Sequence, residues 1–184
     1  MLTGKVVEEF EKEDKKVVIR YPRMDDAEDL MNLMNSLIEE GAKISRQDKL
    51  EFEEEIDWMA EDLKEIEKKK SVHLILLVNG EAVGSASVGK KQHGARSHTG
   101  SFGIVLKKGF REQGLGSKLM EGLLLEVKEQ LKLELLTLDV FESNKRAINF
   151  YKKFGFEKAG EVKDALKINE GYENKITMVK DLRD

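Results

Sequence analysis

The run SVHLILLV, residues 71–78, constrains the fold of this chain more than any other feature. It is almost continuously apolar, which is typical of a buried strand. Asn79-Gly80 follows directly and is the strongest short signal for a β-hairpin. The segment EAVGSASVG (81–89) is therefore predicted to return as the paired strand, and this hairpin is expected to form part of a buried sheet.

Strand and helix patterns alternate along the rest of the chain. Further strands are predicted at residues 5–11, 15–21, 101–106, 133–140, 156–162 and 173–179. Asp25 or Asp26 is expected to cap a first helix that Gly41 ends, and apolar residues at helical spacing also occur at 47–69, 115–131 and 144–154. This order predicts a mixed α/β sheet with helices packed on it. With one proline and no linker-like segment, residues 1–184 are expected to form a single domain.

Charge and composition exclude several classes of function. The net charge of -4 gives no excess of positive charge for a nucleic-acid backbone, so no nucleic-acid partner is expected. The chain has no cysteine, which excludes disulfides, thiolate metal sites and a cysteine nucleophile. Because no apolar run approaches the length of a membrane span and the N-terminus lacks a signal-peptide core, no membrane partner is expected. A soluble cytoplasmic protein is the default.

The segment KKGFREQGLGSKLM, residues 107–120, joins a predicted strand to a predicted helix and is rich in glycine. Free backbone N–H groups and the helix dipole attract phosphate at such a junction. A nucleotide-triphosphate loop requires GxxxxGK[ST]. Gly109 and Gly114 have the right separation, but Leu115 stands where the lysine must be, so this class of phosphate site is excluded.

A dinucleotide fingerprint, GxGxxG, also fails in this segment. Gly114 and Gly116 begin it, but Leu119 replaces the third glycine. The pattern that remains is Arg111-x-x-Gly114-x-Gly116. It resembles the acetyl-CoA loop of the GCN5-related N-acetyltransferase (GNAT) family, which is written [RQ]-x-x-G-x-[GA].

A second segment, LDVFESNKRAINFYKKFGF (138–156), resembles the other recurrent motif of this family: a strand, then an asparagine, a short helix, and Gly-Phe. The matching residues are Asn144, Ala147, Tyr151, Gly155 and Phe156. The resemblance implies a single mixed, mainly antiparallel GNAT-type sheet with helices on both faces. The N-terminal strand and hairpin, residues 1–16, are an addition to the usual start of the family.

The resemblance also implies a set of residues that bind acetyl-CoA. The backbone of Ile104, Val105 and Leu106 is expected to pair with the pantetheine arm like an added strand. The pyrophosphate is expected at the N–H groups of the glycine-rich loop, with two basic side chains nearby; the loop residues are Arg111, Glu112, Gln113, Gly114, Leu115, Gly116, Ser117 and Lys118. Asn144 and Phe150 are expected to contact the cofactor.

In this family the amine attacks the thioester directly, so the absence of cysteine is no obstacle. Tyr151 is expected to be the general acid that protonates the departing CoA thiolate, because a phenol stays protonated at neutral pH. A backbone amide near Leu106 could polarise the thioester carbonyl. Asp139, five residues before Asn144, is a candidate base, and water leading to bulk solvent is the alternative.

The acceptor is expected to be a primary amine, either a small amine or an amino acid. Acids of the second helix and the last strands could attract a cationic amine or could be solvated: Glu53, Glu54, Glu55, Asp57, Glu170 and Glu173. A protein N-terminal or lysine acetyltransferase is one alternative, and a non-catalytic acetyl-CoA sensor is another. Formation of a homodimer is left open by the sequence. His73, His93 and His98 do not form a metal set, so no metal is assigned.

Overall fold

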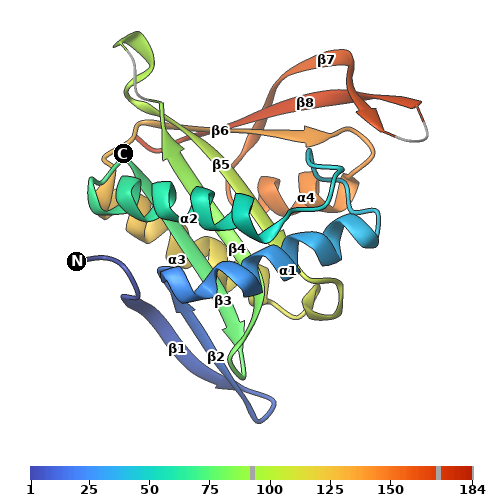
Figure 1. Cartoon of the computed structure of the whole chain (residues 1–184). Coiled ribbons are helices and arrows are strands. Elements are labelled where there is room, and N and C mark those ends of the chain that lie inside the picture. The colour runs from blue at the N-terminus through green and yellow to red at the C-terminus, as the bar shows by residue number, and fades with distance from the viewer. Residues whose placement is uncertain (92–93, 169–170, 184) are drawn as a thin grey trace.

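The computed structural model describes residues 1–91, 94–168 and 171–183. These residues form one eight-stranded sheet in the order β1-β2-β3-β4-β5-β6-β8-β7 (Figure 1). The strands are β1 (Val6–Lys12), β2 (Lys15–Arg20), β3 (Ser71–Val78), β4 (Glu81–Lys90), β5 (Thr99–Leu106), β6 (Leu135–Phe141), β7 (Glu157–Ile168) and β8 (Gly171–Asp181). The helices are α1 (Ala27–Glu39), α2 (Phe52–Glu67), α3 (Leu115–Gln130) and α4 (Lys145–Lys153). The predicted order of elements is confirmed.

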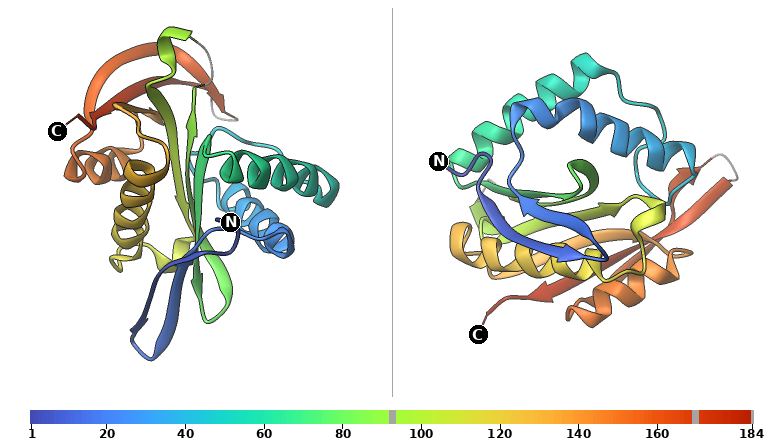
Figure 2. Two further views of the ribbon diagram at one scale, coloured as in Figure 1. Left: turned by 90° about the vertical axis from the view of Figure 1, so that its left-hand side faces the viewer. Right: turned by 90° about the horizontal axis from the view of Figure 1, so that it is seen from below.

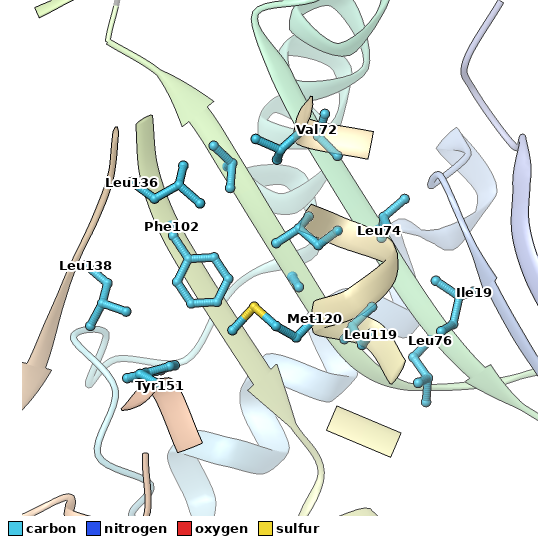
Figure 3. Close-up of a cluster of buried hydrophobic side chains, with 14 of the residues drawn as sticks. Ile19, Val72, Leu74, Leu76, Phe102, Leu119, Met120, Leu136, Leu138 and Tyr151 are labelled. Atoms are coloured by element: carbon cyan, nitrogen blue, oxygen red, sulfur yellow. The ribbon is translucent and has the colours of Figure 1, made fainter. Parts of the chain in front are cut away.

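The helices cover both faces of the sheet, as predicted: α1 and α2 lie on one face and α3 and α4 on the other (Figure 2). The apolar residues that repeat every four positions from Leu115 to Leu131 are all buried in the main core. Leu119 and Met120 of α3 pack there with Leu74 of β3 and Phe102 of β5 (Figure 3). Each such side chain stabilises the fold by about 2 kcal/mol.

One pair of neighbouring strands, β5 and β6, is parallel, whereas the other pairs are antiparallel. The parallel pairing joins Thr99–Ser101 to Leu135–Thr137 and stops there, although both strands continue. Beyond this point the strands diverge (Figure 1). The sheet therefore opens between the second halves of β5 and β6, and this opening positions the candidate site.

The N-terminal extension is confirmed as a hairpin that lengthens the sheet, since β1 pairs with β2 and β2 with β3. It also contacts α3. Lys5 donates to the buried carboxylate of Glu126 at 2.7 Å, and Lys118 pairs with Glu8 at 3.0 Å. The extension thus fixes the helix that follows the glycine-rich loop.

Two local expectations differ from the structure. The second helix begins at Phe52 rather than at residue 47, and the Phe52 side chain is exposed. Residues before it are held in a non-helical segment, where the Asn35 side chain bonds both the N–H and the carbonyl of Leu50. The carboxylate of Asp26 does not cap α1 but binds the guanidinium of Arg20. Of the helices in the described ranges, none is both long and apolar enough to cross a bilayer.

Candidate functional site

A cavity of about 1030 Å³ lies at the opening between β5 and β6. The α1–α2 connection, β5, the glycine-rich loop, β6 and α4 all contribute to its wall. Twelve of the predicted site residues line it: Ile104, Val105, Leu106, Arg111, Glu112, Gly114, Gly116, Ser117, Asp139, Asn144, Phe150 and Tyr151. Segments far apart in the sequence are therefore brought to one cavity, which is large enough for an extended ligand.

The β5 side of the cavity is a sheet edge. Pairing with β6 ends at Ser101, so the second half of β5, from Phe102 to Leu106, has no ladder partner on that side among the described residues. Unpaired backbone N–H and C=O groups of this kind bind an extended chain that carries amides. Leu138 and Val140 of β6 line the facing side.

The glycine-rich loop ends at the N-terminus of α3. Gly114 is the N-cap residue and has φ 80, a left-handed conformation that favours glycine. The first intrahelical bonds here are made by the N–H groups of Ser117 and Lys118 to the Gly114 carbonyl. The N–H groups of the first helical turn before them point out of the helix end, where they and the positive end of the helix dipole would attract an anion.

The Arg111 side chain fastens this loop. Its Nε donates to the Leu106 carbonyl at 2.7 Å, and its guanidinium forms an ion pair with Glu40 at the end of α1. Sequence reasoning found Arg111 but missed Glu40, because nothing in the local pattern of α1 indicates a partner 71 residues away. This ion pair connects the glycine-rich loop to the C-terminal end of α1.

Three predicted loop residues do not line the cavity with their side chains. Leu115 is buried in the core, Gln113 donates to the Gly109 carbonyl, and Lys118 points to the N-terminal hairpin. Near the glycine-rich loop and α4, the cavity is lined by three basic residues that the sequence did not single out: Lys108, Arg146 and Lys153. They place positive charge at the α3 and α4 side of the cavity.

Tyr151 lies on α4 and is held by other aromatic rings. Its ring is 5.8 Å from Phe102, 5.8 Å from Phe150 and 5.9 Å from Phe156. Burial raises the pKa of the Tyr151 phenol to about 12. The side chain therefore remains protonated and can donate a proton within the cavity at neutral pH.

Asn144 begins α4, as expected from its role as an N-cap residue. Its side-chain oxygen accepts a hydrogen bond from the Ala147 N–H at 3.2 Å. Asn144 and Phe150 both line the cavity. Asn144 thus fixes the start of the helix that carries Tyr151.

Asp139 lines the cavity, and its carboxylate is already bound by two other side chains. It accepts a hydrogen bond from Thr177 at 2.6 Å and pairs with Lys175 at 3.0 Å. Burial alone would raise the pKa of this carboxyl, but the bonds from Thr177 and Lys175 outweigh burial and lower the pKa below its ordinary value. Asp139 is therefore a weak proton acceptor at neutral pH.

At the α1–α2 side, Lys43 lines the cavity and forms an ion pair with Glu173 of β8. Its ammonium lies 5.8 Å from the centre of the Phe141 ring. The pair bridges the α1–α2 connection and the β7–β8 hairpin. Hydrogen bonds from Lys43 and Ser143 lower the pKa of Glu173.

The other acids considered as acceptor ligands lie elsewhere. Glu53, Glu54 and Asp57 are exposed on α2, and Glu170 lies outside the described residues. Glu55 differs from the solvated residues around it because it is buried on the face of α2 that covers the sheet.

Of the histidines, His73 is buried in β3 and His98 is exposed, while His93 lies outside the described residues. In the described parts of the chain, no group of three or more His, Asp and Glu side chains could hold a metal ion.

Comparison with known proteins agrees with this geometry. A model of the acetyltransferase (GNAT) family matches residues 32–156. L-amino acid N-acetyltransferase AaaT of Escherichia coli K12 is 33% identical over 87 residues, which are 47% of this chain and 54% of that protein, so the match spans about half of the relative's length. Spermine/spermidine N(1)-acetyltransferase of Bacillus subtilis 168 is 29% identical over 120 residues, 63% of this chain and 78% of that protein.

The fold has close counterparts among solved structures. The acetyltransferase yncA of Salmonella typhimurium, described as putative and solved with its cofactor acetyl-CoA, superposes with a TM-score of 0.80 at 16% identity. The superposition covers 91% of this chain and 95% of that one, so it shows the fold. The family match over residues 32–156 establishes that the chain belongs to the GNAT acetyltransferase family.

Proposed function

We propose that this protein transfers the acetyl group of acetyl-CoA directly to the primary amine of a small amine or an amino acid. The observation that carries the proposal is that one cavity joins the glycine-rich loop, the unpaired edge of β5 and the buried phenol of Tyr151. These are the parts needed to bind a phosphorylated, amide-containing donor and to protonate its leaving group.

The residues of the cavity fit acetyl-CoA. The edge of β5 at Ile104–Leu106 would pair with the amides of the pantetheine arm. The pyrophosphate would lie at the N-terminus of α3, where Gly114 and Gly116 leave the backbone N–H groups accessible. Phe150 would pack along the cofactor. When bound, acetyl-CoA supplies the activated acyl group.

The chain's own groups then act on the reacting centre. A backbone N–H near Leu106 would donate to the thioester oxygen as negative charge develops on it. The Tyr151 hydroxyl would give its proton to the CoA sulfur as the carbon–sulfur bond breaks, and solvent would return a proton to the phenol.

Substitution of Asp139 tests whether its carboxylate helps to hold the acceptor amine. Because the pKa of its carboxyl is lowered, the group is ionised throughout the neutral range and would stabilise the positive amine electrostatically. Asp139→Asn is expected to reduce kcat/KM about fivefold, equally at every pH from about 6 to 9, since no titration of this group falls in that window. A pH–rate profile measures this. A loss that grows as the pH falls would instead make Asp139 the titrating base.

The bridge between Lys43 and Glu173 favours a small acceptor over a protein chain. It ties the α1–α2 connection to β8 at the edge of the cavity, where a polypeptide would need room. Arg111 pairs with Glu40, and Lys175 pairs with Asp139, so each of these acids already has one cationic partner. An amino acid, whose carboxylate would compete with Glu173 for Lys43, fits this pattern better than a polycation.

Lys43→Ala is therefore expected to raise the acceptor KM about tenfold and to leave the KM for acetyl-CoA unchanged, because one charge-assisted contact is lost. Steady-state kinetics with each substrate varied separately measure both constants. Lys49→Ala is the matched control, since Lys49 belongs to the same segment but is exposed and pairs with Glu39. A lower acceptor KM in the Lys43 variant would point to a cationic acceptor such as a polyamine.

The function itself is tested by release of CoA thiol from acetyl-CoA in the presence of single L-amino acids, spermidine and an alanine-terminated peptide. Release that depends on a small amine is the expected result. Tight binding of acetyl-CoA without release by any of these acceptors would identify a sensor instead.

A further inference from the structure

Three basic side chains on the cavity wall have no acidic partner among the described residues. Two other cations of this wall, Lys43 and Arg111, pair with Glu173 and Glu40. In the same described part of the chain, no ion pair or hydrogen bond engages the side chains of Lys108, Arg146 and Lys153. The mechanism proposed above uses none of these three groups.

The acids of the same wall do not neutralise these charges. Besides Glu40, the described acids that line the cavity are Asp139, which pairs with Lys175, and Glu112. Glu112 belongs to the glycine-rich loop and is exposed. The unpaired cations therefore outnumber the unpaired acid here, although the whole chain carries a net charge of -4. This part of the cavity is a local positive region that attracts an anion.

Two of the cations share one face of α4. Arg146 precedes Phe150 by four residues and Lys153 follows it by three, so the three side chains leave the helix on the same side. All three residues line the cavity. With a rise of about 1.5 Å per residue, each cation begins about 4.5–6 Å from Phe150 along the helix axis. Phe150 is thus flanked by a positive charge on each side.

Phe150 is also the point at which α4 meets the start of α3. A β-carbon on Gly116 would lie 3.8 Å from the Phe150 ring, so this ring is next to the first turn of α3. Lys108 comes from the short turn Lys108–Phe110, which joins β5 to the glycine-rich loop. The cations therefore belong to the two elements that adjoin the proposed pyrophosphate site, and not to the helix end that would hold the pyrophosphate.

The cofactor offers an anion for these cations. CoA carries a third phosphate, on the 3′-oxygen of the ribose that its pyrophosphate links to the pantetheine arm. A phosphate monoester has a charge of about −1.5 to −2 at pH 7 and three strong acceptor oxygens. Lysine and arginine bind such a group through charge-assisted hydrogen bonds. The three cations are exposed, so they can reach a phosphate that lies at the mouth of the cavity.

We propose that Lys108, Arg146 and Lys153 bind the 3′-phosphate of CoA and make the protein prefer CoA to 3′-dephospho-CoA, an inference that rests on the proposed function. In this arrangement backbone N–H groups hold the pyrophosphate and side chains hold the monoester. Acetyl-CoA and free CoA make the same contacts, because the acetyl group is at the other end of the molecule.

The test is calorimetric titration of the protein with CoA and with 3′-dephospho-CoA, in the absence of any acceptor. The wild-type protein is expected to bind CoA about tenfold more tightly, because exposed ion pairs are individually weak but three of them act together. The triple variant Lys108→Gln, Arg146→Gln, Lys153→Gln should bind CoA about tenfold more weakly and change its affinity for 3′-dephospho-CoA by less than about twofold.

The matched control is a triple variant of the neighbouring lysines: Lys107→Gln, Lys145→Gln and Lys152→Gln. It removes the same net charge within one residue of each proposed contact, but in the described chain none of these lysines lines the cavity. The control should keep the preference for CoA. Equal loss of CoA affinity in both triple variants would show a general effect of net charge and would overturn the proposal.

The outcomes separate this subsite from the function on which it depends. If the wild-type protein binds neither ligand, the proposed function fails. If it binds CoA and 3′-dephospho-CoA equally well, or if the first triple variant loses the same factor for both, CoA is still the cofactor but these cations do not recognise its 3′-phosphate. The comparison of the two ligands on the wild-type protein needs no variant, so it decides the proposal whatever the stability of the variants.

Discussion

Replacing Tyr151 by phenylalanine is expected to lower kcat by at least tenfold, because general acid catalysis contributes roughly 10²–10⁴-fold to the rate. The phenol is the buried proton donor in the cavity, and burial raises its pKa to about 12, so it stays protonated at every pH used for the assay. Affinity for acetyl-CoA should change little, because the loss falls on the transition state, in which charge develops on sulfur.

The substitution leaves the packing intact. The rings of Phe102, Phe150 and Phe156 that hold Tyr151 contact its aromatic face and edge, which phenylalanine keeps. The temperature of unfolding should therefore match that of the wild-type protein. Tyr172→Phe is the control, since Tyr172 is an exposed tyrosine of β8. Full turnover in Tyr151→Phe would show that Tyr151 is only a core residue and that the leaving group is protonated by water.

The second large effect is expected from Gly116→Val. Gly116 lines the cavity in the first turn of α3, and a β-carbon there would lie no closer than 3.8 Å to Leu106 or Phe150. A β-carbon at this position is therefore accommodated by the protein, and the valine side chain would occupy the space in front of the N–H groups. Affinity for acetyl-CoA should fall about 100-fold or more, since charge-assisted hydrogen bonds to the pyrophosphate are lost.

Calorimetric titration with acetyl-CoA measures this loss, and circular dichroism confirms that the fold is retained. Gly122→Ala is the matched control on the same helix. Its β-carbon would lie 3.5 Å from Val7, an ordinary contact, and Gly122 is not among the cavity-lining residues of the described chain. Equal affinity in Gly116→Val and the wild-type protein would exclude the glycine-rich loop as the pyrophosphate site.

The order of elements could be predicted because each element carries its own local signal. The apolar run at 71–78 with Asn79-Gly80 became β3 and its hairpin, and the four-residue repeat from Leu115 became α3. The predicted start of α2, at residue 47, was wrong, because the helix begins at Phe52. The segment before Phe52 has charged residues compatible with a helix, but its conformation is decided by tertiary bonds such as those of Asn35.

The backbone parts of the candidate site could also be proposed from sequence, because a strand, a glycine loop and a helix start are contiguous. The ion pairs that organise it could not. Glu40 meets Arg111, and Lys43 meets Glu173, only after the chain has folded. Glu55 looked like one more solvated acid of a charged helix, and its burial depends on how α2 crosses the sheet.

The most direct measurement is the fate of isotopically labelled acetyl groups after incubation of the protein with labelled acetyl-CoA and the amine that best promotes thiol release. Direct transfer predicts that the label appears in the acetylated amine in equal amount to the released CoA, with none retained on the protein. Label that remains in bound acetyl-CoA, with no acetylated amine formed from any L-amino acid, polyamine or peptide offered, would contradict the proposed function.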